Sequence, residues 1–541
     1  MKVFLLGLDG MTSRVIMPYV EKNFLPNFKK VMDNGVSGIL RSTIPPVTAP
    51  AWASLVTGKT PMKHGVFEFR QLTGYETTFI TKNSSSTAEP IWDILSRNGK
   101  TVNILNVPLT YPPDKVNGVM VSGMMTPNIR TDFTFPKEIK QDIFKLIPDY
   151  RIDIETREFL SSCNKDALLK QVFKITHDRR KLMHYFLDKQ SWDLFFITLV
   201  GPDRIQHFMW EDVMAMHPEC VRYYSLLDDV LGDILQRMDS DSLLFIVSDH
   251  GFDATKKAFA INKFLEETSL LHLRKNKKAK HKSKKTKTGR TVLFLIGLLA
   301  KMKLLRLKKY LPPTLLNSLK NRFWSIVSGK NEVDWQKTKV FSFLLHDIRV
   351  NLKGREPLGS VEPQDYDKLC DKVRDALLKV RDPETGENIV QNVFKGSELY
   401  PTDQTVDNKP DLIFVLNNGY NAYYDLVADG ILTDTKSTGP IYSAYHDMDG
   451  LLLAYGHNVE NIKTNADIYD IVPTILYCLG LPIPKDIDGR VLTEVMNPEF
   501  VVKNKIRFET STEYNPSQKN KLTKEEEEEL ERQLKNLGYL S

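Results

Sequence analysis

Cysteine is scarce in this chain: its 541 residues contain four, at positions 163, 220, 370 and 478. They lie far apart and no two form a CxxC pair, which argues against a disulfide framework and a thiolate metal site. The first residues, MKVFLLGLDG, lack the length and the small-residue cleavage site of a signal peptide, so we interpret them as the first strand. No internal repeat is visible. We therefore expect a cytoplasmic protein.

Acidic residues are absent from one segment, RKNKKAKHKSKKTKTGR at 274–290, and an apolar run broken by Lys301, Lys303 and Arg306 follows it. This run is too short for a membrane span, which needs about 20 apolar residues. A solvated insertion followed by a cap helix is the simplest interpretation. Residues 274–310 could instead lie on an anionic membrane surface, making the protein peripheral there, or contact a polyanion. We expect no specific nucleic-acid partner.

The rest of the composition is that of an ordinary soluble protein, 41% hydrophobic and 26% charged. Several apolar runs, such as KVFLLGLDG and DSLLFIVSDHG, end abruptly in polar residues and do not alternate. Uninterrupted runs are typical of parallel strands covered on both faces. Helix-like segments such as EPIWDILSRNGK and YYSLLDDVLGDILQRMD lie between them. The pattern predicts an α/β fold with helices on both faces of the sheet.

We divide the chain into four parts. Residues 1–265 and 331–505 are predicted to form the two halves of a catalytic α/β core, with segments such as DIRVNLKGREPLG and PDLIFVLNNGY continuing it as strands. Residues 266–330 form the basic, cap-like insertion. Residues 506–541 form a tail that ends in a charged helix, which Thr523 begins as its N-cap.

Aspartate and histidine gather at the predicted strand ends. Asp203 and His207 are four residues apart, so a helical turn places them on one face. Asp249 and His250 are adjacent and can act together only in the turn beyond their strand. The full set, expected at one edge of one sheet, is Asp9, Asp203, His207, Asp249, His250 and His446.

Mixed Asp and His ligation suits Zn²⁺, Mn²⁺, Fe or Co. Six such ligands can hold two metal ions about 4 Å apart, an arrangement used in phosphoryl transfer. Thr48 lies among prolines at the start of a small-residue, helix-like run, PPVTAPAWASLVTG. It could serve as a helix N-cap, as a nucleophile activated by a metal ion, or as both. Free N–H groups at that helix end would favour an incoming phosphate.

The motifs GLDG, PPVTAPAWASLVTGKTPMKHG, DRIQH, SDHGF and YHDMDGLLLAYG occur in this order over nearly the whole chain. Together they resemble the alkaline phosphatase superfamily, in its type I phosphodiesterase/nucleotide pyrophosphatase branch and the predicted phosphohydrolase/phosphomutase group. The resemblance implies an alkaline phosphatase-like α/β fold with a cap-like insertion. It also implies a two-step reaction through a phosphothreonine at Thr48 and two divalent metal ions, Zn²⁺ or else Mn²⁺.

The resemblance assigns a role to each position. Asp9, Asp249 and His250 would bind one metal ion, with Thr48 at its open position. Asp203, His207 and His446 would bind the second, which activates the hydrolytic water.

One departure from the family pattern affects the substrate. In nucleotide pyrophosphatases the HG pair is followed shortly by Asp-Asn, whose Asn helps to hold the phosphate, whereas HGVFEFRQ places Glu68 and Phe69 here. Phe69 cannot donate that hydrogen bond, so Arg70 or Asn106 would contact the phosphate.

We expect a metal-dependent phosphodiesterase or nucleotide pyrophosphatase that acts on a small-molecule, lipid-linked or sugar-linked phosphate ester. A phosphomonoesterase or phosphomutase is the alternative within the same chemistry. A membrane-associated scaffold with little activity is the alternative of another class.

Overall fold

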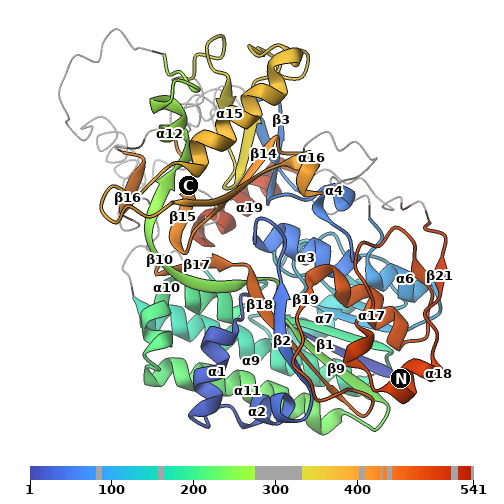
Figure 1. Ribbon diagram of the computed structural model, residues 1–541. Coiled ribbons are helices and arrows are strands. Elements are labelled where there is room, and N and C mark those ends of the chain that lie inside the picture. The colour runs from blue at the N-terminus through green and yellow to red at the C-terminus, as the bar shows by residue number, and fades with distance from the viewer. Residues whose placement is uncertain are drawn as a thin grey trace, which may run out of the picture.

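The computed structural model describes residues 1–80, 88–155, 164–189, 191–274, 332–400, 409–426, 428, 430–434, 442–512, 514 and 522–537. Its largest element is a nine-stranded sheet flanked by helices (Figure 1). The strand order is β19 (Ala466–Asp467), β2 (Val36–Arg41), β18 (Asp449–Gly456), β9 (Ser242–Val247), β1 (Lys2–Leu8), β8 (Leu194–Leu199), β5 (Val102–Leu105), β6 (Gly118–Val121) and β7 (Thr134–Phe135).

The five central strands, from β9 to β6, are parallel to one another, whereas β18 and β7, which flank them, pair with them antiparallel. They are the uninterrupted apolar runs of the sequence, and β8 and β9 are buried at every position. Alternate side chains of β1 enter two separate cores, with Phe4 and Leu6 on one face and Val3 and Leu5 on the other. The prediction of a parallel sheet covered on both faces is therefore confirmed.

Helices cover each face of this sheet (Figure 1). One face packs against α1 (Ser13–Glu21), α2 (Pro26–Asp33), α9 (Lys165–Lys189) and α11 (Pro218–Arg237). The other face packs mainly against α3 (Thr48–Thr57), α6 (Ile91–Arg97) and α17 (Ile471–Cys478). The helix-like segments identified in the sequence therefore lie where an α/β fold requires them.

A smaller body rises from the carboxyl ends of the central strands (Figure 1). Its four-stranded sheet has the order β11 (Val340–Phe341), β12 (Asp347–Val350), β14 (Leu412–Leu416) and β13 (Val390–Lys395), and every pair is antiparallel. With α12 (Ile261–Glu267) and α15 (Tyr366–Leu378) this sheet encloses a core of its own.

The strands over DIRV and LIFVL therefore pair with each other and not with the large sheet that we expected them to extend. The structural reason is that their apolar side chains, such as Ile348 and Phe414, are buried in the separate core.

A long strand, β10 (Gly251–Ala260), joins the two bodies (Figure 1). It pairs with β17 (Ala444–Asp447) near the large sheet and with β15 (Gly419–Tyr423) and β16 (Leu432–Asp434) farther along. A Cβ at Gly251 would lie 2.2 Å from the carbonyl oxygen of Asp449, so the close approach of β10 to β18 requires glycine there.

The remaining elements are shorter connections and the terminal helix. The connecting helices and strands are α4 (Pro61–His64), β3 (Arg70–Thr73), β4 (Glu76–Phe79), α7 (Ile139–Leu146), α10 (Gly201–Met214), α16 (Gly396–Leu399), β20 (Ile483–Pro484), α18 (Pro498–Lys503) and β21 (Phe508–Glu509). The terminal helix is α19 (Lys524–Leu537). Thr523 caps it as predicted, because its hydroxyl oxygen accepts a hydrogen bond from the backbone N–H of Glu526 at 3.3 Å.

Most of the basic insertion, residues 275–331, lies outside the described residues, and so does nearly all of the segment 274–310 that we considered for membrane contact. The division at residues 266, 331 and 506 stays a prediction. None of the described helices combines the length and the apolar character that a membrane span needs.

Candidate active site

The predicted aspartates lie beyond the carboxyl ends of three neighbouring parallel strands. Asp9 directly follows β1, and Asp203 lies in the first turn of α10, which begins two residues after β8. Asp249 and His250 form the turn between β9 and β10. Because parallel strands present their carboxyl ends at one edge, the three carboxylates meet there.

Asp9, Asp249 and His250 form a first group, whose ligand atoms all lie within 4.8 Å of one another. The Nε2 of His250 lies 3.1 Å from Oδ2 of Asp249 and 3.8 Å from Oδ1 of Asp9. Neither of these two carboxylate oxygens has a hydrogen-bond partner among the described residues, although both are buried. Buried acceptors without a donor are costly, so this group fits a cation.

Two neighbours orient these carboxylates. The backbone N–H of Gly10 donates a hydrogen bond to Oδ1 of Asp249 at 3.1 Å, and the indole N–H of Trp52 donates to Oδ2 of Asp9 at 3.4 Å. Gly10 has a φ of +70°, and a Cβ there would lie 2.5 Å from the ring of Phe252. Glycine is therefore required at this position.

Asp203, His207 and His446 form a second group beside the first. The Oδ1 of Asp203 lies 3.4 Å from Nε2 of His207 and 3.5 Å from Nε2 of His446. The two histidine Nε2 atoms are 3.1 Å apart. The ring of His446 stacks on that of His250 with centroids 3.7 Å apart, so the two groups adjoin.

Each of the three histidine rings is held at Nδ1 by a backbone carbonyl group. In each of them Nδ1 faces a backbone carbonyl oxygen: Gly251 for His250 at 3.2 Å, Ala444 for His207 at 3.2 Å and Pro46 for His446 at 3.0 Å. A carbonyl only accepts, so each Nδ1 carries the proton and each Nε2 directs a lone pair into the site. Two Nε2 lone pairs 3.1 Å apart repel each other unless a cation lies between them, which is how imidazole ligands are held.

Protonation in this site follows from burial and from the neighbouring charges. Burial raises the pKa values of Asp9 and Asp249 well above their usual range, and the other carboxylates add to the rise. Burial alone would also raise the pKa of Asp203, but His207 and Arg204 hold it well below that range. Burial lowers the pKa of His446 to about 4 and that of His250 well below its ordinary value. The site therefore offers neutral imidazoles at His250 and His446 and, at Asp9 and Asp249, carboxylates that lack compensating charge, and it fits divalent cations.

Thr48 is the first residue of α3 and is fully buried. The N-cap of this helix is Val47, and no side chain makes the cap hydrogen bond. The Thr48 hydroxyl faces His250, with Oγ1 at 3.1 Å from Nε2. Thr48 thus lies beside the first group, at the N-terminal end of a helix, where the helix dipole favours an anion.

In the part of the chain that the structure describes, Arg70 and Asn106 contact other parts of the fold. The Arg70 guanidinium lies 3.5 Å from the Glu531 carboxylate of α19 and 4.5 Å from the ring centroid of Phe79. The amide nitrogen of Asn106 donates to the hydroxyl of Tyr150 at 2.5 Å and to the carbonyl oxygen of Ser122 at 3.4 Å. The described interactions of both side chains are therefore within the fold, and their proposed phosphate contacts stay a prediction.

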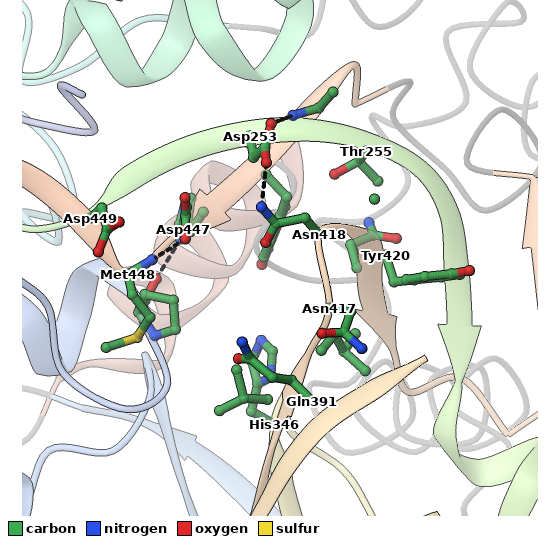
Figure 2. A pocket seen from close by; sticks show the side chains of 18 of the residues that line it. Asp253, Thr255, His346, Gln391, Asn417, Asn418, Tyr420, Asp447, Met448 and Asp449 are labelled. Atoms are coloured by element: carbon green, nitrogen blue, oxygen red, sulfur yellow. Dashed lines mark hydrogen bonds between the residues drawn. The ribbon is translucent and has the colours of Figure 1, made fainter. Parts of the chain in front are cut away.

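A cavity of about 300 Å³ opens beside His446, between the large sheet and the smaller body (Figure 2). Asp447, Met448 and Asp449 of the large-sheet side line one wall, and Asn417, Asn418 and Tyr420 line the other. His346 lines it too. The lining residues of the smaller body, such as Gln391, were not identified from the sequence, because they come from distant segments and follow no motif.

The second group is also braced by the terminal helix. The ring of Tyr442 packs against that of His207 with centroids 4.8 Å apart. Its hydroxyl donates a hydrogen bond to the carbonyl oxygen of Leu537 at 2.8 Å. The sequence predicted a charged terminal helix; the buried leucines of α19 also join the main core.

Comparisons with known proteins place the chain in a family. The sequence profile of the type I phosphodiesterase/nucleotide pyrophosphatase family matches residues 3–437. The chain matches no curated protein sequence. Among solved structures it is similar to human and mouse ectonucleotide pyrophosphatase/phosphodiesterase 5, with 14% and 15% identity, 92% of this chain and 100% of each of those chains covered, and a TM-score of 0.49 for both. An inactive variant of the mouse protein in complex with AMP is similar at 14% identity, with 89% and 95% coverage and a TM-score of 0.47.

The profile covers well over half of the chain, and it agrees with the resemblance carried by the GLDG, TAPAW and SDHGF motifs. Members of this family are metal-dependent enzymes, and two groups of ligand atoms here, Asp9 with Asp249 and His250, and Asp203 with His250 and His446, could each hold a metal ion. The chain belongs to the type I phosphodiesterase/nucleotide pyrophosphatase family.

Proposed function

We propose that this protein hydrolyses a phosphodiester through a covalent phosphothreonine at Thr48. The observation that carries the proposal is the position of the Thr48 hydroxyl, at the start of α3 and 3.1 Å from Nε2 of His250. A threonine hydroxyl is a weak nucleophile unless a neighbouring group activates it. The adjoining Asp and His groups supply such surroundings.

The chemistry runs in two displacements. Oγ1 of Thr48 forms a bond to phosphorus while the bond from phosphorus to one ester oxygen breaks, and the proton lost by Thr48 ends on the departing alcohol. Water then attacks the same phosphorus, the bond to Oγ1 breaks, and a proton from the water returns to Thr48. The products are an alcohol and a phosphomonoester. The N–H groups at the start of α3 stabilise the charge on the phosphoryl oxygens.

Two groups of residues would hold metal ions. Asp9, Asp249 and His250 would hold one ion, and Asp203, His207 and His446 the other. Bound divalent cations would lower the pKa of the threonine hydroxyl and of the attacking water and would offset phosphate charge. Zn²⁺ fits this mixed donor set best, and Mn²⁺ accepts the same ligands.

The contacts of Arg70 and Asn106, the two candidate phosphate-binding residues, favour a diester over a monoester. A dianionic monoester is held well by a bidentate arginine, and Arg70 is the sequence candidate for that contact. The Arg70 guanidinium lies beside Glu531 and over Phe79 instead, so its charge is partly compensated. The N–H groups of Asn106 donate to Tyr150 and Ser122. A singly charged diester needs less positive charge from these residues than a dianionic monoester does.

The test compares bis-p-nitrophenyl phosphate with p-nitrophenyl phosphate, using protein whose bound metal has been measured. We expect turnover that favours the diester and that is lost in Thr48→Ala. Preference for the monoester would favour a phosphatase, and isomerisation of a phosphate ester without release of phosphate would favour a mutase. Bound metal without turnover of any ester would contradict the proposal and favour the scaffold alternative.

A further inference from the structure

We propose that the cavity beside His446 binds a neutral, hydroxyl-rich group of the substrate, such as a glycerol, an inositol or a single sugar ring. This inference rests on the proposed function, because it names the group that the phosphodiester carries. The cavity adjoins the candidate metal groups through His446, whose Nδ1 donates to the carbonyl oxygen of Pro46, another lining residue. A substrate whose phosphorus faces Thr48 would extend one ester group into it.

The charged residues of the cavity wall nearly balance, because two arginines, Arg14 and Arg41, lie there with three aspartates, Asp253, Asp447 and Asp449. Arg14 lies between Asp253 and Asp447, and its distance to the Asp447 carboxylate is 2.8 Å. Arg41 of β2 lies directly opposite Asp449 of β18 in the antiparallel ladder. Side chains opposite each other in such a pair share one face of the sheet. The wall therefore has little excess of either sign, and it lacks the cluster of unpaired cations that a further phosphate would require.

The wall contains buried polar atoms that lack partners. The Oδ1 of Asn421 and the hydroxyl of Tyr445 have no hydrogen-bond partner among the described residues. Both side chains line the cavity and are only 8% exposed. Leaving such groups unpaired is unfavourable. Both atoms are enclosed within the wall, so a ligand hydroxyl would reach them after a rotation of the side chain, and it would then donate to the amide oxygen and accept from the phenol.

Two further side chains add polar groups to the cavity. Gln391 lies at an irregularity in the pairing of β13 with β14, where the register shifts between Val390 and Asn392, and its amide lies beside His346 in Figure 2. Such irregularities commonly redirect a side chain. The Nδ1 of His346 donates to the carbonyl oxygen of Phe414 at 3.0 Å, which leaves Nε2 as an acceptor.

Size and composition disfavour a nucleoside. A volume of about 300 Å³ lies at the lower end of the range for small-molecule pockets, roughly 300–1,000 Å³. The aromatic side chains that line it are Tyr420 and Tyr445. Tyr445 stacks on His446 with centroids 4.6 Å apart, and the hydroxyl of Tyr420 donates to Asp382 at 2.8 Å. A nucleobase usually needs an open aromatic face for stacking. Amide and carboxylate side chains suit hydroxyl groups better.

The experiment uses p-nitrophenyl phosphodiesters that share one leaving group and differ only in the second ester: glycerol, myo-inositol, methyl, choline or thymidine 5′. We expect kcat/KM for the glycerol or inositol ester to exceed that for the methyl, choline and thymidine esters by at least about tenfold. Equal values for the methyl ester, or a preference for the choline or thymidine ester, would overturn the inference while leaving the proposed function intact. Hydrolysis of none of the esters would contradict the proposed function itself.

Asn421→Leu tests the cavity directly, and exposed Asn34→Leu is the matched control. We expect Asn421→Leu to reduce the preference for the polyol ester over the methyl ester by about tenfold, mainly through KM, and Asn34→Leu to leave that ratio unchanged. If Asn421→Leu does not fold, Gln391→Leu in the exposed part of the wall replaces it.

Saturation-transfer NMR with free myo-inositol and thymidine provides a readout that is independent of turnover. A signal for inositol that falls in the cavity variant supports the inference. A thymidine signal alone, or an inositol signal that is unchanged in the variant, overturns it.

Discussion

The hydroxyl oxygen of Thr48 lies 3.1 Å from Nε2 of His250, although the two residues are 202 positions apart in the chain. Thr48 begins the helix that follows β2, and His250 ends the turn that follows β9. The carbonyl oxygen of Gly251 fixes the His250 ring, so its Nε2 faces the hydroxyl. The fold therefore brings the candidate nucleophile to the candidate ligands.

Substitutions at Thr48 should separate its hydroxyl from its methyl group. Thr48→Ala removes the nucleophile, so we expect the kcat for diester hydrolysis to fall by at least about 10³-fold with little change in thermal stability. Thr48→Ser keeps a hydroxyl and should retain turnover within about 100-fold of the wild-type kcat, because the oxygen keeps its place beside His250. Stopped-flow release of p-nitrophenol measures both. Equal residual activity in the two variants would contradict a nucleophilic role.

Each of the two Asp and His ligand groups should hold one metal ion. We expect two divalent ions per chain in the wild-type protein and about one in each of Asp9→Asn and His207→Ala, because each substitution removes a ligand from a different group. Inductively coupled plasma mass spectrometry measures the content, and Asp188→Asn at an exposed ion pair is the control. Two ions in both ligand variants would show that these side chains are not ligands.

Removal of metal should also destabilise the fold. Asp9 and Asp249 are buried with oxygen atoms that lack donors, and a bound cation would stabilise them. We expect a chelator to lower the midpoint of thermal unfolding in the wild-type protein and to have less effect in Asp9→Asn. Differential scanning calorimetry measures the shift. A wild-type midpoint that is indifferent to the chelator would contradict the cation site.

The terminal helix should support the second group of ligands. Leu534 is 1% exposed and packs in the main core, and Tyr442 donates to the last described residue of α19, Leu537. We expect Leu534→Ala to lower the free energy of unfolding by about 2–4 kcal/mol and to weaken metal retention. Denaturant unfolding measures the first effect and metal content after dialysis the second. Glu525→Ala, on the exposed side of the same helix, should change neither; if it acts as Leu534→Ala does, the packing explanation fails.

The free energy of unfolding should depend on pH partly through the buried carboxyl of Glu68. Burial raises the pKa of this carboxyl to about 8, Asp347 adds to the rise, and the N–H of Phe69 and the charge of Arg70 oppose it. The folded state therefore retains a proton that the unfolded state loses near pH 4.5, so stability is present below that pH and declines as the pH rises toward 8.

Glu68→Gln cannot lose a proton, so its stability relative to wild type should increase between pH 5 and pH 8.5 by a few kcal/mol, on the order of 1.4 kcal/mol for each unit of pKa shift. Urea unfolding at several pH values measures this change. Glu499→Gln at an exposed position is the control, and parallel stability curves for Glu68→Gln and wild type would contradict the buried, protonated carboxyl.

Much of the large sheet could be predicted from the sequence, because runs such as LFFIT and SLLFIV have a simple physical signature. They are apolar at every position, and only a strand covered on both faces tolerates that. The polar residues that end these runs then had to meet at one edge. The residues Asp9, Asp203 and Asp249 do meet there, and the helical spacing of Asp203 and His207 places both on α10.

The smaller body and the cavity could not be predicted in the same way. Local apolar patterns around Ile348 and Phe414 indicate strands but not which sheet they join, since partner choice depends on tertiary packing. Gln391 and Asn421 enter the cavity from different strands, and neither has a motif. The packing of α19 against the main core was not predicted, because glutamates dominate the sequence of this helix. Three of its leucines, Leu530, Leu534 and Leu537, are nevertheless buried in the core.

Trapping the covalent intermediate tests the central claim most directly. Metal-loaded protein is mixed with bis-p-nitrophenyl phosphate, quenched in acid within milliseconds to seconds, digested and analysed by mass spectrometry. The account predicts a phosphorylated ester on the peptide that contains Thr48, at Thr48 itself, formed and lost at rates that match turnover, and absent from Thr48→Ala. Turnover without any modified Thr48 peptide, or with the modification at another residue, would contradict it.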